Sequence, residues 1–368
     1  MRIRTLMITA ISLLALLALM SFAACQQATQ TSTTETSALL SQDCDRACLE
    51  GYVDRYMDAM LSHEAGADLF SANCRFTENG IQLPLGKGLW ASMAGKGTYK
   101  FYVPDMATQQ VAFIGTAREE ARNPDQPTSI TIALRLKIRN GLITEAEQLV
   151  IRPESNLLNP DAPPARSAAD SIEKMGAPHQ IYTEVIPEAE RPSREEMIKT
   201  ANYYFTGMQK NDGKGHYPFT DDCHRIENGN AATNVPLLPG AKRPDPKTEL
   251  VYSSNWGCRE QFESGLIHFV TLIRDRRFVA VDHERGVVFS FCFFDHDAGK
   301  TRHFKSPDGR DVIEGPTEPW TWQVAELFKI ENGNIRRIEA ILQRAPYGMN
   351  AGWSTYEQGM SDEIQYVQ

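Results

Sequence analysis

The chain contains one run of residues twice, and this internal repeat constrains its fold more than any other feature. Cys-Arg-Phe-Thr-Glu-Asn-Gly at 74–80 returns as Cys-His-Arg-Ile-Glu-Asn-Gly at 223–229. Two further matches flank this pair in the same order: Tyr56–Met60 with Tyr204–Met208 upstream, and Lys137–Gly141 with Lys329–Gly333 downstream. Matches that keep their order along a chain predict two copies of one fold, which we name copy one and copy two.

Each copy is predicted to begin with an amphipathic helix and to end with a β-hairpin. Apolar residues recur at helical spacing over 49–60 and 197–208, and the run 193–196 predicts a capping box at the start of the second helix. Alternating apolar and charged residues surround the dipeptides at 140–141 and 332–333, which are both Asn-Gly. Asn-Gly favours a tight hairpin turn because both residues tolerate positive φ.

Length and composition fit two globular domains. The chain has 368 residues, of which 42% are hydrophobic and 23% charged, and this is enough for two cores. The net charge of −9 argues against a nucleic-acid partner, because phosphate binding needs a basic surface. The predicted organisation is a signal peptide (1–25), a polar tether (26–43), a first domain (44–152), a Pro-rich linker without clear periodicity (153–192), and a second domain (193–368) with enlarged loops around 239–246 and 298–319.

The first residues have the pattern of an export signal. Arg2 and Arg4 precede an apolar run over 6–19, which is short for a membrane span, and small residues then precede Cys25. This order resembles a bacterial lipoprotein signal with lipidation at Cys25, so that a lipid anchor is the expected membrane contact. Simple cleavage and an uncleaved anchor are the alternatives. The expected location is the periplasm, free or as a membrane-anchored lipoprotein.

Six cysteines remain beyond the predicted signal, and an even number in an oxidising compartment favours disulfides. We expect Cys44 or Cys48 to pair with Cys74, and Cys223 to pair with Cys258, because both pairs are local within a copy. Buried free thiols are the alternative. A zinc site is not expected, since no second Cys-x-x-Cys type pair occurs.

The chain resembles the ketosteroid-isomerase or SnoaL-like family in two respects. One is the order of its elements, which is a helix, further short helices and a curved antiparallel sheet that closes on long hairpins. The other is the Arg-Phe-Thr-Glu-Asn-Gly segment. The resemblance covers 44–152 and 193–345, and the closing segment from Pro346 is similar to a tandem subfamily of secreted bacterial and fungal proteins. It implies an α+β fold with two tandem cone-shaped sheets, as in nuclear transport factor 2, each packed on N-terminal helices. Relatives use the apolar cone for cofactor-free acid/base chemistry or for plain ligand binding.

Steroid isomerases of this family use a tyrosine on the first helix as hydrogen-bond donor and a carboxylate on a strand as base. The resemblance places Tyr56 with Glu78 in copy one and Tyr204 with Glu227 in copy two. Desolvation in an apolar cone raises the pKa of a carboxyl group toward neutrality. The alternative is that Glu-Asn-Gly is a plain turn with an exposed glutamate, and its recurrence in both copies favours the turn.

Histidines are concentrated in copy two, which holds six of the eight, and histidine is the natural acid or base near neutral pH. His224 replaces Arg75 of copy one in the repeated run. Asp282 precedes His283 and is predicted to orient its ring as a carboxylate–histidine dyad. His268 lies in an apolar run, where a core histidine is the alternative.

Aromatic residues also favour copy two. We predict that Phe291, Trp256 and Trp322 line a pocket for an aromatic ligand together with Glu227 and His268, and ordinary core packing is the alternative. No Gly-rich phosphate loop, Gly-x-Ser-x-Gly or His-Glu-x-x-His motif occurs, so neither cofactor nor metal is expected.

The sequence therefore predicts a cofactor-independent lyase or isomerase that acts on an apolar, aromatic small molecule in copy two. His224 or His283 is the expected base, Tyr204 the donor and Arg344 the anion stabiliser. Copy one is expected to be a structural, dimer-like partner, and a homodimer of the whole chain stays open. The alternative function is a non-catalytic small-molecule-binding or envelope-interaction module.

Overall fold

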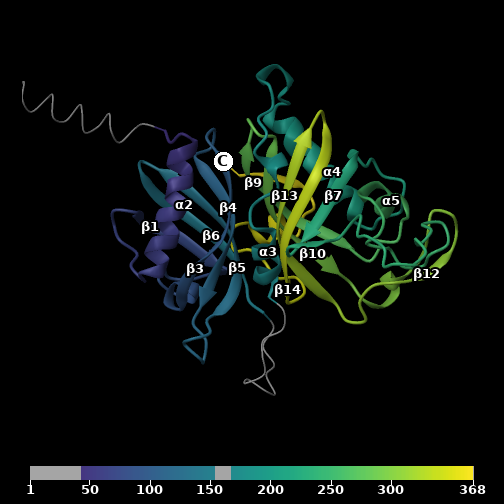
Figure 1. Cartoon of the computed structure of the whole chain (residues 1–368), viewed down its shortest axis with the longest axis horizontal. Coiled ribbons are helices and arrows are strands. Elements are labelled where there is room, and N and C mark those ends of the chain that lie inside the picture. Colours follow the sequence, from purple (N-terminus) through teal and green to yellow (C-terminus); the bar gives the residue numbers. More distant parts are fainter. Residues whose placement is uncertain (1–42, 154–166, 368) are drawn as a thin grey trace, which may run out of the picture. The chain divides into compact units, whose positions relative to one another are not determined.

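The computed structural model describes residues 43–153 and 167–367, and the predicted signal, tether and lipidation site at Cys25 lie outside these residues. The described residues from Cys44 onward form one compact unit. This unit has an α+β architecture with two large sheets and few helices (Figure 1).

Copy one builds a six-stranded sheet with strand order β2-β1-β6-β5-β4-β3. Helix α2 precedes the sheet and buries Tyr56 and its apolar neighbours, as the helical spacing predicted. The bounds are α2 Arg46–Leu61, β1 Phe70–Glu78, β2 Ile81–Gln82, η1 Gly88–Ala91, β3 Met93–Asp105, β4 Gln110–Glu119, β5 Thr128–Arg139 and β6 Leu142–Ile151.

Copy two builds a seven-stranded sheet with strand order β15-β9-β10-β13-β14-β7-β8. Its first helix, α4, begins at the capping box that Ser193 and Glu196 form. The bounds are α4 Arg194–Met208, β7 Phe219–Glu227, β8 Asn230–Ala231, α5 Cys258–Glu263, β9 Leu272–Asp282, β10 Val287–His296, β13 Trp320–Glu331, β14 Asn334–Ala345, α6 Tyr356–Gly359 and β15 Ile364–Tyr366.

The two sheets share one topology and one register. Asn140 and Asn332 have positive φ at the turns of the β5–β6 and β13–β14 hairpins, as Asn-Gly predicted. The repeated run forms the β1–β2 hairpin in copy one and the β7–β8 hairpin in copy two. The expectation of purely antiparallel sheets is corrected, because β1 lies parallel to β6 and β7 lies parallel to β14. Both sheets are therefore mixed.

Each sheet presents one face to its own helix and the other face to the second sheet. Alternation along β13 shows the division: Val324 and Phe328 pack in one core with α4, whereas Ala325 and Leu327 pack in a cluster that contains strands of both copies. Copy one has the equivalent helix-facing core against α2. The shared cluster joins the copies back to back, and the buried ion pair between Arg277 and Glu147 crosses it at 2.7 Å.

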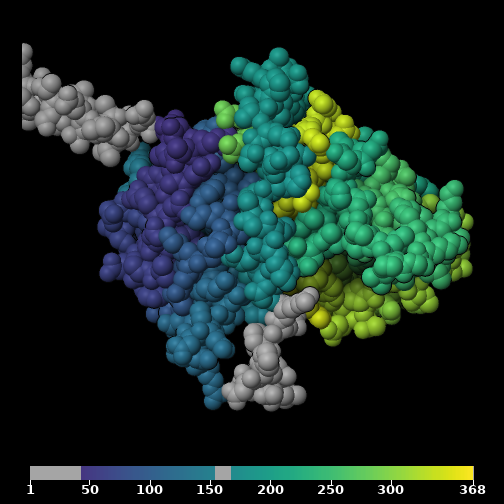
Figure 2. Space-filling view, viewed as in Figure 1, coloured from purple at the N-terminus to yellow at the C-terminus, as the bar shows by residue number. Residues whose placement is uncertain are grey.

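The additional residues of copy two lie in two segments, 232–271 between β8 and β9 and 297–319 between β10 and β13. The first contains α5, and the second contains η4 (Gly299–Arg302), β11 (His303–Lys305) and β12 (Asp311–Ile313). Figure 2 shows them together at the right of the view, in green and yellow-green. Arg310 joins them by donating to the carbonyl oxygen of Pro246 at 3.0 Å.

The segment between the copies is more regular than its composition predicted. Helix α3 (Ala168–Met175) begins at Ser167, whose hydroxyl accepts a hydrogen bond from the backbone N–H of Ala169. Two short 3-10 helices follow, η2 (Gln180–Tyr182) and η3 (Glu188–Glu190). Ile172, Ile181 and Tyr182 pack into the cluster between the sheets, so this segment contributes to the contact between the copies.

The structure confirms one predicted disulfide and corrects the other. Cys223 is bonded to Cys258, with the Cα atoms 5.9 Å apart. Cys44 is bonded to Cys48, because the two lie four residues apart where α2 begins, with Cα atoms 5.2 Å apart. Cys74 is therefore free and packs against the core of copy one. No helix in the described ranges is long and apolar enough to cross a membrane.

Candidate functional site

The candidate site lies in the helix-facing core of copy two, around Tyr204. This residue occupies the buried side of α4 and is 1% exposed. Four phenylalanine rings surround its phenol ring at centroid distances of 5.4 to 6.5 Å, which are typical of aromatic packing. They are Phe205, Phe219, Phe262 and Phe328. Burial raises the pKa of Tyr204, so its hydroxyl remains a hydrogen-bond donor at neutral pH.

Glu326 is the carboxyl group of this core. It lies on β13, is 1% exposed and lies close enough to Tyr204 for each group to affect the pKa of the other. Burial raises its pKa to about 8, against an opposing effect of the nearby Arg225. Its Oε2 atom is buried and has no hydrogen-bond partner. Leaving a buried carboxyl oxygen unpaired is costly, and such atoms are rare in folded proteins.

Arg225 supplies a buried positive charge beside these two groups. It lies on β7, is 4% exposed, and its guanidinium carbon is 5.7 Å from the centre of the Tyr204 ring. It donates to Gln261 at 2.6 Å and to Glu227 at 2.5 Å. The side chain of Glu227 is 37% exposed, so this ion pair runs from the buried core toward solvent.

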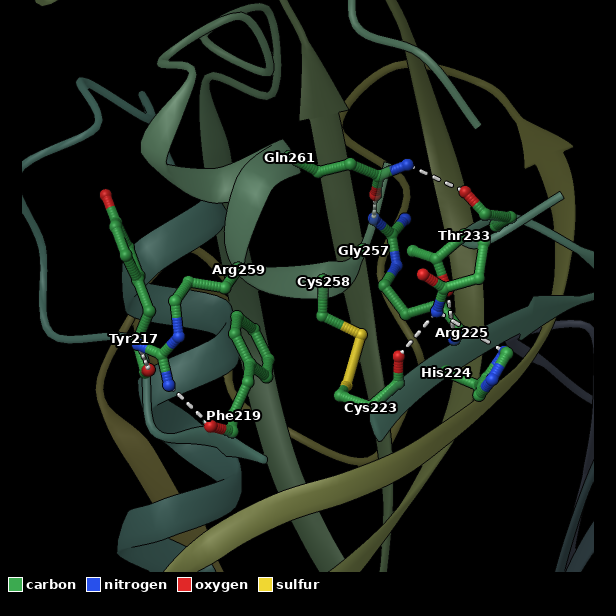
Figure 3. The surroundings of a disulfide bond; sticks show 12 residues. Tyr217, Phe219, Cys223, His224, Arg225, Thr233, Gly257, Cys258, Arg259 and Gln261 are labelled. Atoms are coloured by element: carbon green, nitrogen blue, oxygen red, sulfur yellow. Dashed lines mark hydrogen bonds between the residues drawn. A yellow bond between two sulfur atoms is a disulfide. The ribbon is translucent and has the colours of Figure 1, made fainter. Parts of the chain in front are cut away.

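The Cys223–Cys258 disulfide holds the helix that carries Gln261, which accepts a hydrogen bond from Arg225. Figure 3 shows Cys223 on β7 joined to Cys258 on α5, with the Gln261 side chain directed at Arg225. Arg259 of the same helix donates to the carbonyl oxygen of Phe219 at 2.5 Å. α5 is thus attached to β7 at two points, which hold Gln261 of the same helix beside Arg225.

Copy one has the same scaffold with a different chemistry. Tyr56 matches Tyr204, but its hydroxyl donates to Gln148 on β6 at 2.9 Å. Gln148 in turn donates to Glu78 at 2.9 Å. The hairpin registers align Gln148 with Ala340 and Leu134 with Glu326. The polar group beside the helix tyrosine therefore lies on β6 in copy one and on β13 in copy two.

The expectation that Glu-Asn-Gly exposes its glutamate is wrong for copy one. Glu78 is 7% exposed and also binds Arg152 at 3.0 Å. Asn79 and Gly80 do form the predicted turn, with φ of 50° and 77°. The segment therefore supplies both a turn and a buried carboxylate.

The predicted histidine bases do not lie beside Tyr204. Side chains alternate along β7, so that Cys223 and Arg225 face the core and His224 does not; its ring approaches Asn234 at 3.5 Å. The Asp282–His283 dyad is also corrected. Arg46 holds Asp282 with two hydrogen bonds of 2.6 and 2.8 Å. His283 is exposed, and its Nε2 lies 2.7 Å from the carbonyl oxygen of Pro192.

The predicted binding residues are dispersed. Phe291 lies between the two sheets, because it occupies the face of β10 opposite Cys292. Trp256 is fully buried in a small cluster that residues of both insertions form. His268 stacks on Phe304 at 4.7 Å and contacts the Asn211 carbonyl oxygen.

Two predicted residues lie at the end of β13 and β14. Trp322 packs against the core that contains Tyr204. Arg344 is exposed, pairs with Glu318 and lies over the ring of Trp320 at 5.4 Å, so it does not reach the buried site.

Sequence reasoning missed Arg225, Glu326 and Gln261. The first two had a readable signal, because each is a charged residue at a position where copy one has an apolar one. Phe76 precedes Glu78 by two residues as Arg225 precedes Glu227, and Leu134 precedes its Asn-Gly turn by six residues as Glu326 does. Gln261 lies in the insertion and has no counterpart to compare.

Tyr204, Arg225 and Glu326 do not line the cavity between the two insertions. This cavity has a volume of about 440 Å³ and is lined by polar loop residues such as Lys247, Glu263 and Arg310. Within 43–153 and 167–367, no group of three or more His, Cys, Asp or Glu side chains is arranged to hold a metal ion.

The comparisons with known proteins address copy two. The fold is α+β with two sheets, and a family model described as "Domain of unknown function (DUF8021)" matches residues 190–342. The match extends from just before α4 into β14 and so contains Tyr204, Arg225 and Glu326. A search of curated proteins finds no match.

Proposed function

We propose that the chain is an exported tandem protein of the SnoaL-like, nuclear transport factor 2-like type, and that copy two is a cofactor-independent lyase or isomerase for an apolar small molecule. The shared topology of the copies, each with a helix across a curved hairpin sheet, supports the fold assignment. The two disulfides support export, because such bonds persist in oxidising compartments.

The observation that carries the catalytic proposal is the unpaired Oε2 of Glu326. A carboxyl with a pKa of about 8, in contact with a phenol and close to a guanidinium, is matched to proton transfer near neutral pH. The proposed carboxylate is thus Glu326, in place of Glu227 or a histidine. Glu227 instead balances the charge of Arg225.

The proposed step is proton abstraction next to a carbonyl group. Ionised Glu326 takes the proton from carbon, and the electron pair of the broken C–H bond forms the enolate. Tyr204 donates a hydrogen bond to the enolate oxygen, and the charge of Arg225 stabilises it. Return of the proton to another carbon gives an isomerase, and loss of a leaving group from the enolate gives a lyase.

A non-catalytic binding module is the second candidate, and one observation favours it. Tyr204, Arg225 and Glu326 are all less than 5% exposed, and aromatic rings close around the phenol. A ligand reaches Glu326 only when some of these side chains move. The two candidates differ in whether the bound ligand exchanges a proton.

The test measures deuterium incorporation at carbon. A panel of cyclic and aryl ketones is incubated with the protein in D₂O, and NMR monitors the exchange. This assay detects proton abstraction whatever the net reaction is. We expect exchange by the full-length chain, a loss of at least about 100-fold in Glu326→Gln and a smaller loss in Tyr204→Phe. The rate is expected to rise about tenfold per pH unit below pH 8 and then level off, because the ionised carboxyl is the base.

The matched control is Tyr56→Phe, which makes the same change in copy one. It is expected to leave the exchange rate unchanged. Exchange that survives Glu326→Gln would refute the assignment of the base. Binding of a panel ketone without exchange would favour the non-catalytic module.

A further inference from the structure

Five aromatic rings form a connected group at one end of the core of copy two, which we name the aromatic rim. Consecutive ring centroids lie 6.0, 6.0, 4.0 and 4.5 Å apart, in the order Tyr252, Phe269, His296, Trp320 and Trp322. Tyr252, Phe269 and Trp322 are half-buried and pack against the same core as Tyr204. The rim therefore contacts both solvent and the proposed site.

The rim is a property of copy two alone. The strand registers align Trp320, Trp322 and His296 with Thr128, Ile130 and Glu119 of copy one. Tyr252 and Phe269 come from the insertion at 232–271, which copy one lacks. Copy two thus differs from copy one in two places of the same core, since it alone has both the buried charges and a group of rings at the end of the sheet.

Trp322 of the aromatic rim and the buried carboxyl group of Glu326 lie on the same strand, β13. Trp322, Val324 and Glu326 occupy alternate positions of β13 and so share the helix-facing side of the sheet. Four residues of strand separate Trp322 from Glu326 by about 13 Å. A ligand in contact with both must be elongated.

The rim is apolar near neutral pH. His296 is 2% exposed, and burial lowers its pKa to about 4, so its ring is uncharged. Arg344 lies over Trp320, but its charge is paired with Glu318. The half-buried faces of Tyr252, Phe269 and Trp322 are suited to a flat ring, because aromatic rings gain from offset or edge contacts beyond the area they bury.

We propose that the aromatic rim is a stacking subsite for a flat aromatic ring of an elongated ligand whose polar end reaches Tyr204 and Glu326. This inference rests on the function proposed above and narrows its substrate class. The ligand has a planar ring at one end and a hydrogen-bond acceptor on the order of 13 Å away.

The test compares 4-phenylphenol with its saturated counterpart, 4-cyclohexylcyclohexanol, in calorimetric titrations of the full-length chain. The two probes share their connectivity and the position of their hydroxyl group, and only the first is flat and aromatic. Both are too short to span the distance from the rim to Glu326, so they test the ring end of the ligand alone. We expect 4-phenylphenol to bind at least about tenfold more tightly. Trp322→Ala and Phe269→Ala should each weaken 4-phenylphenol about tenfold and change the saturated probe by less than about twofold.

The control is Trp353→Ala, which removes a half-buried tryptophan that contacts Arg75 and Arg135 instead of the rim. It should change the affinity for neither probe. Circular dichroism checks the fold of each variant, and Trp322→Leu replaces Trp322→Ala where the smaller side chain prevents folding. Equal affinity for the two probes, or equal effects of Trp353→Ala and Trp322→Ala, would overturn the subsite.

Glu326→Gln separates this inference from the proposed function. The variant should keep its preference for 4-phenylphenol, because it leaves the rim intact. A preference for the flat probe together with no carbon-acid exchange in the chain would support the rim and refute the proton transfer. Exchange without any preference would refute the rim alone.

Discussion

The cores of the two copies are built from equivalent helices and strands but contain different side chains beside the helix tyrosine. Around Tyr56, copy one places Phe76 and Leu134, and it satisfies the phenol with an uncharged glutamine. Around Tyr204, copy two places Arg225 and Glu326 at the positions of Phe76 and Leu134. Copy one shows that the fold needs neither charge. Their presence in copy two is therefore better explained by chemistry than by stability.

The hydrogen bonds of the two cores differ in the same sense. In copy one, Tyr56, Gln148 and Glu78 form a continuous chain of bonds, and Trp90 donates to the Tyr56 hydroxyl at 3.1 Å. In copy two, Oε2 of Glu326 and Nε of Arg225 are buried without partners. A satisfied network rigidifies a core, whereas unpaired polar atoms leave binding capacity for a ligand.

The largest effect is expected from removal of the Cys223–Cys258 disulfide, which has no equivalent in copy one. Cys258→Ser opens a loop that spans 35 residues, so we expect the free energy of unfolding to fall by about 3–4 kcal/mol. Cys74→Ser, at the equivalent position of Cys223, should cost less than about 1 kcal/mol because Cys74 is free. Urea denaturation measures both. Equal losses would contradict the difference between the copies.

An intermediate effect is expected when copy two receives the residue of copy one. Glu326→Leu should raise the free energy of unfolding at pH 7 by about 1–4 kcal/mol, because apolar residues often replace buried ionisable groups with a gain in stability. The same variant should lose carbon-acid exchange. A loss of stability in Glu326→Leu would indicate that the carboxyl group has a structural role.

The smallest expected effect is the change in stability per pH unit. The pKa of Glu326 is raised in the folded chain, so the unfolded chain ionises first as the pH rises from about 4.5 to 8. Folding is then disfavoured by up to about 1.4 kcal/mol per pH unit in that window and by a constant amount above it. The melting temperature of Glu326→Gln relative to the unmodified chain should therefore increase from pH 5 to pH 8. For Tyr56→Phe, whose phenol has a raised pKa, the difference should not change with pH.

Much of the scaffold was readable from the sequence, and most of the site was not. The order of the matched segments predicted two copies, and Asn-Gly at 140–141 and 332–333 predicted both hairpins because local turn chemistry decides them. The parallel placement of β1 beside β6 depends on contacts between distant segments, and no local pattern reveals it. Helix α3 was missed because its short run within a Pro-rich segment gives little periodicity.

The prediction of histidine bases was wrong because it considered the residue type and not the side of the strand on which each side chain lies. His224 lies between Cys223 and Arg225, and alternation turns it away from the core that both neighbours enter. Asp282 precedes His283, but a distant helix supplies its true partner, Arg46. Tyr204 was correctly placed in the core because helical spacing defines the buried side of α4.

Back-to-back packing within one chain gives the two cores freedom to differ. In a symmetric dimer, each substitution would appear in both subunits, so a buried glutamate at the position of Leu134 would destabilise both cores at once. Here Arg46 and Glu147 of copy one bind Asp282 and Arg277 of copy two, so the partner is always present at a fixed ratio. The core of copy one, whose polar groups are hydrogen-bonded, can then remain a stable support while the core of copy two carries the unfavourable burial of Arg225 and Glu326.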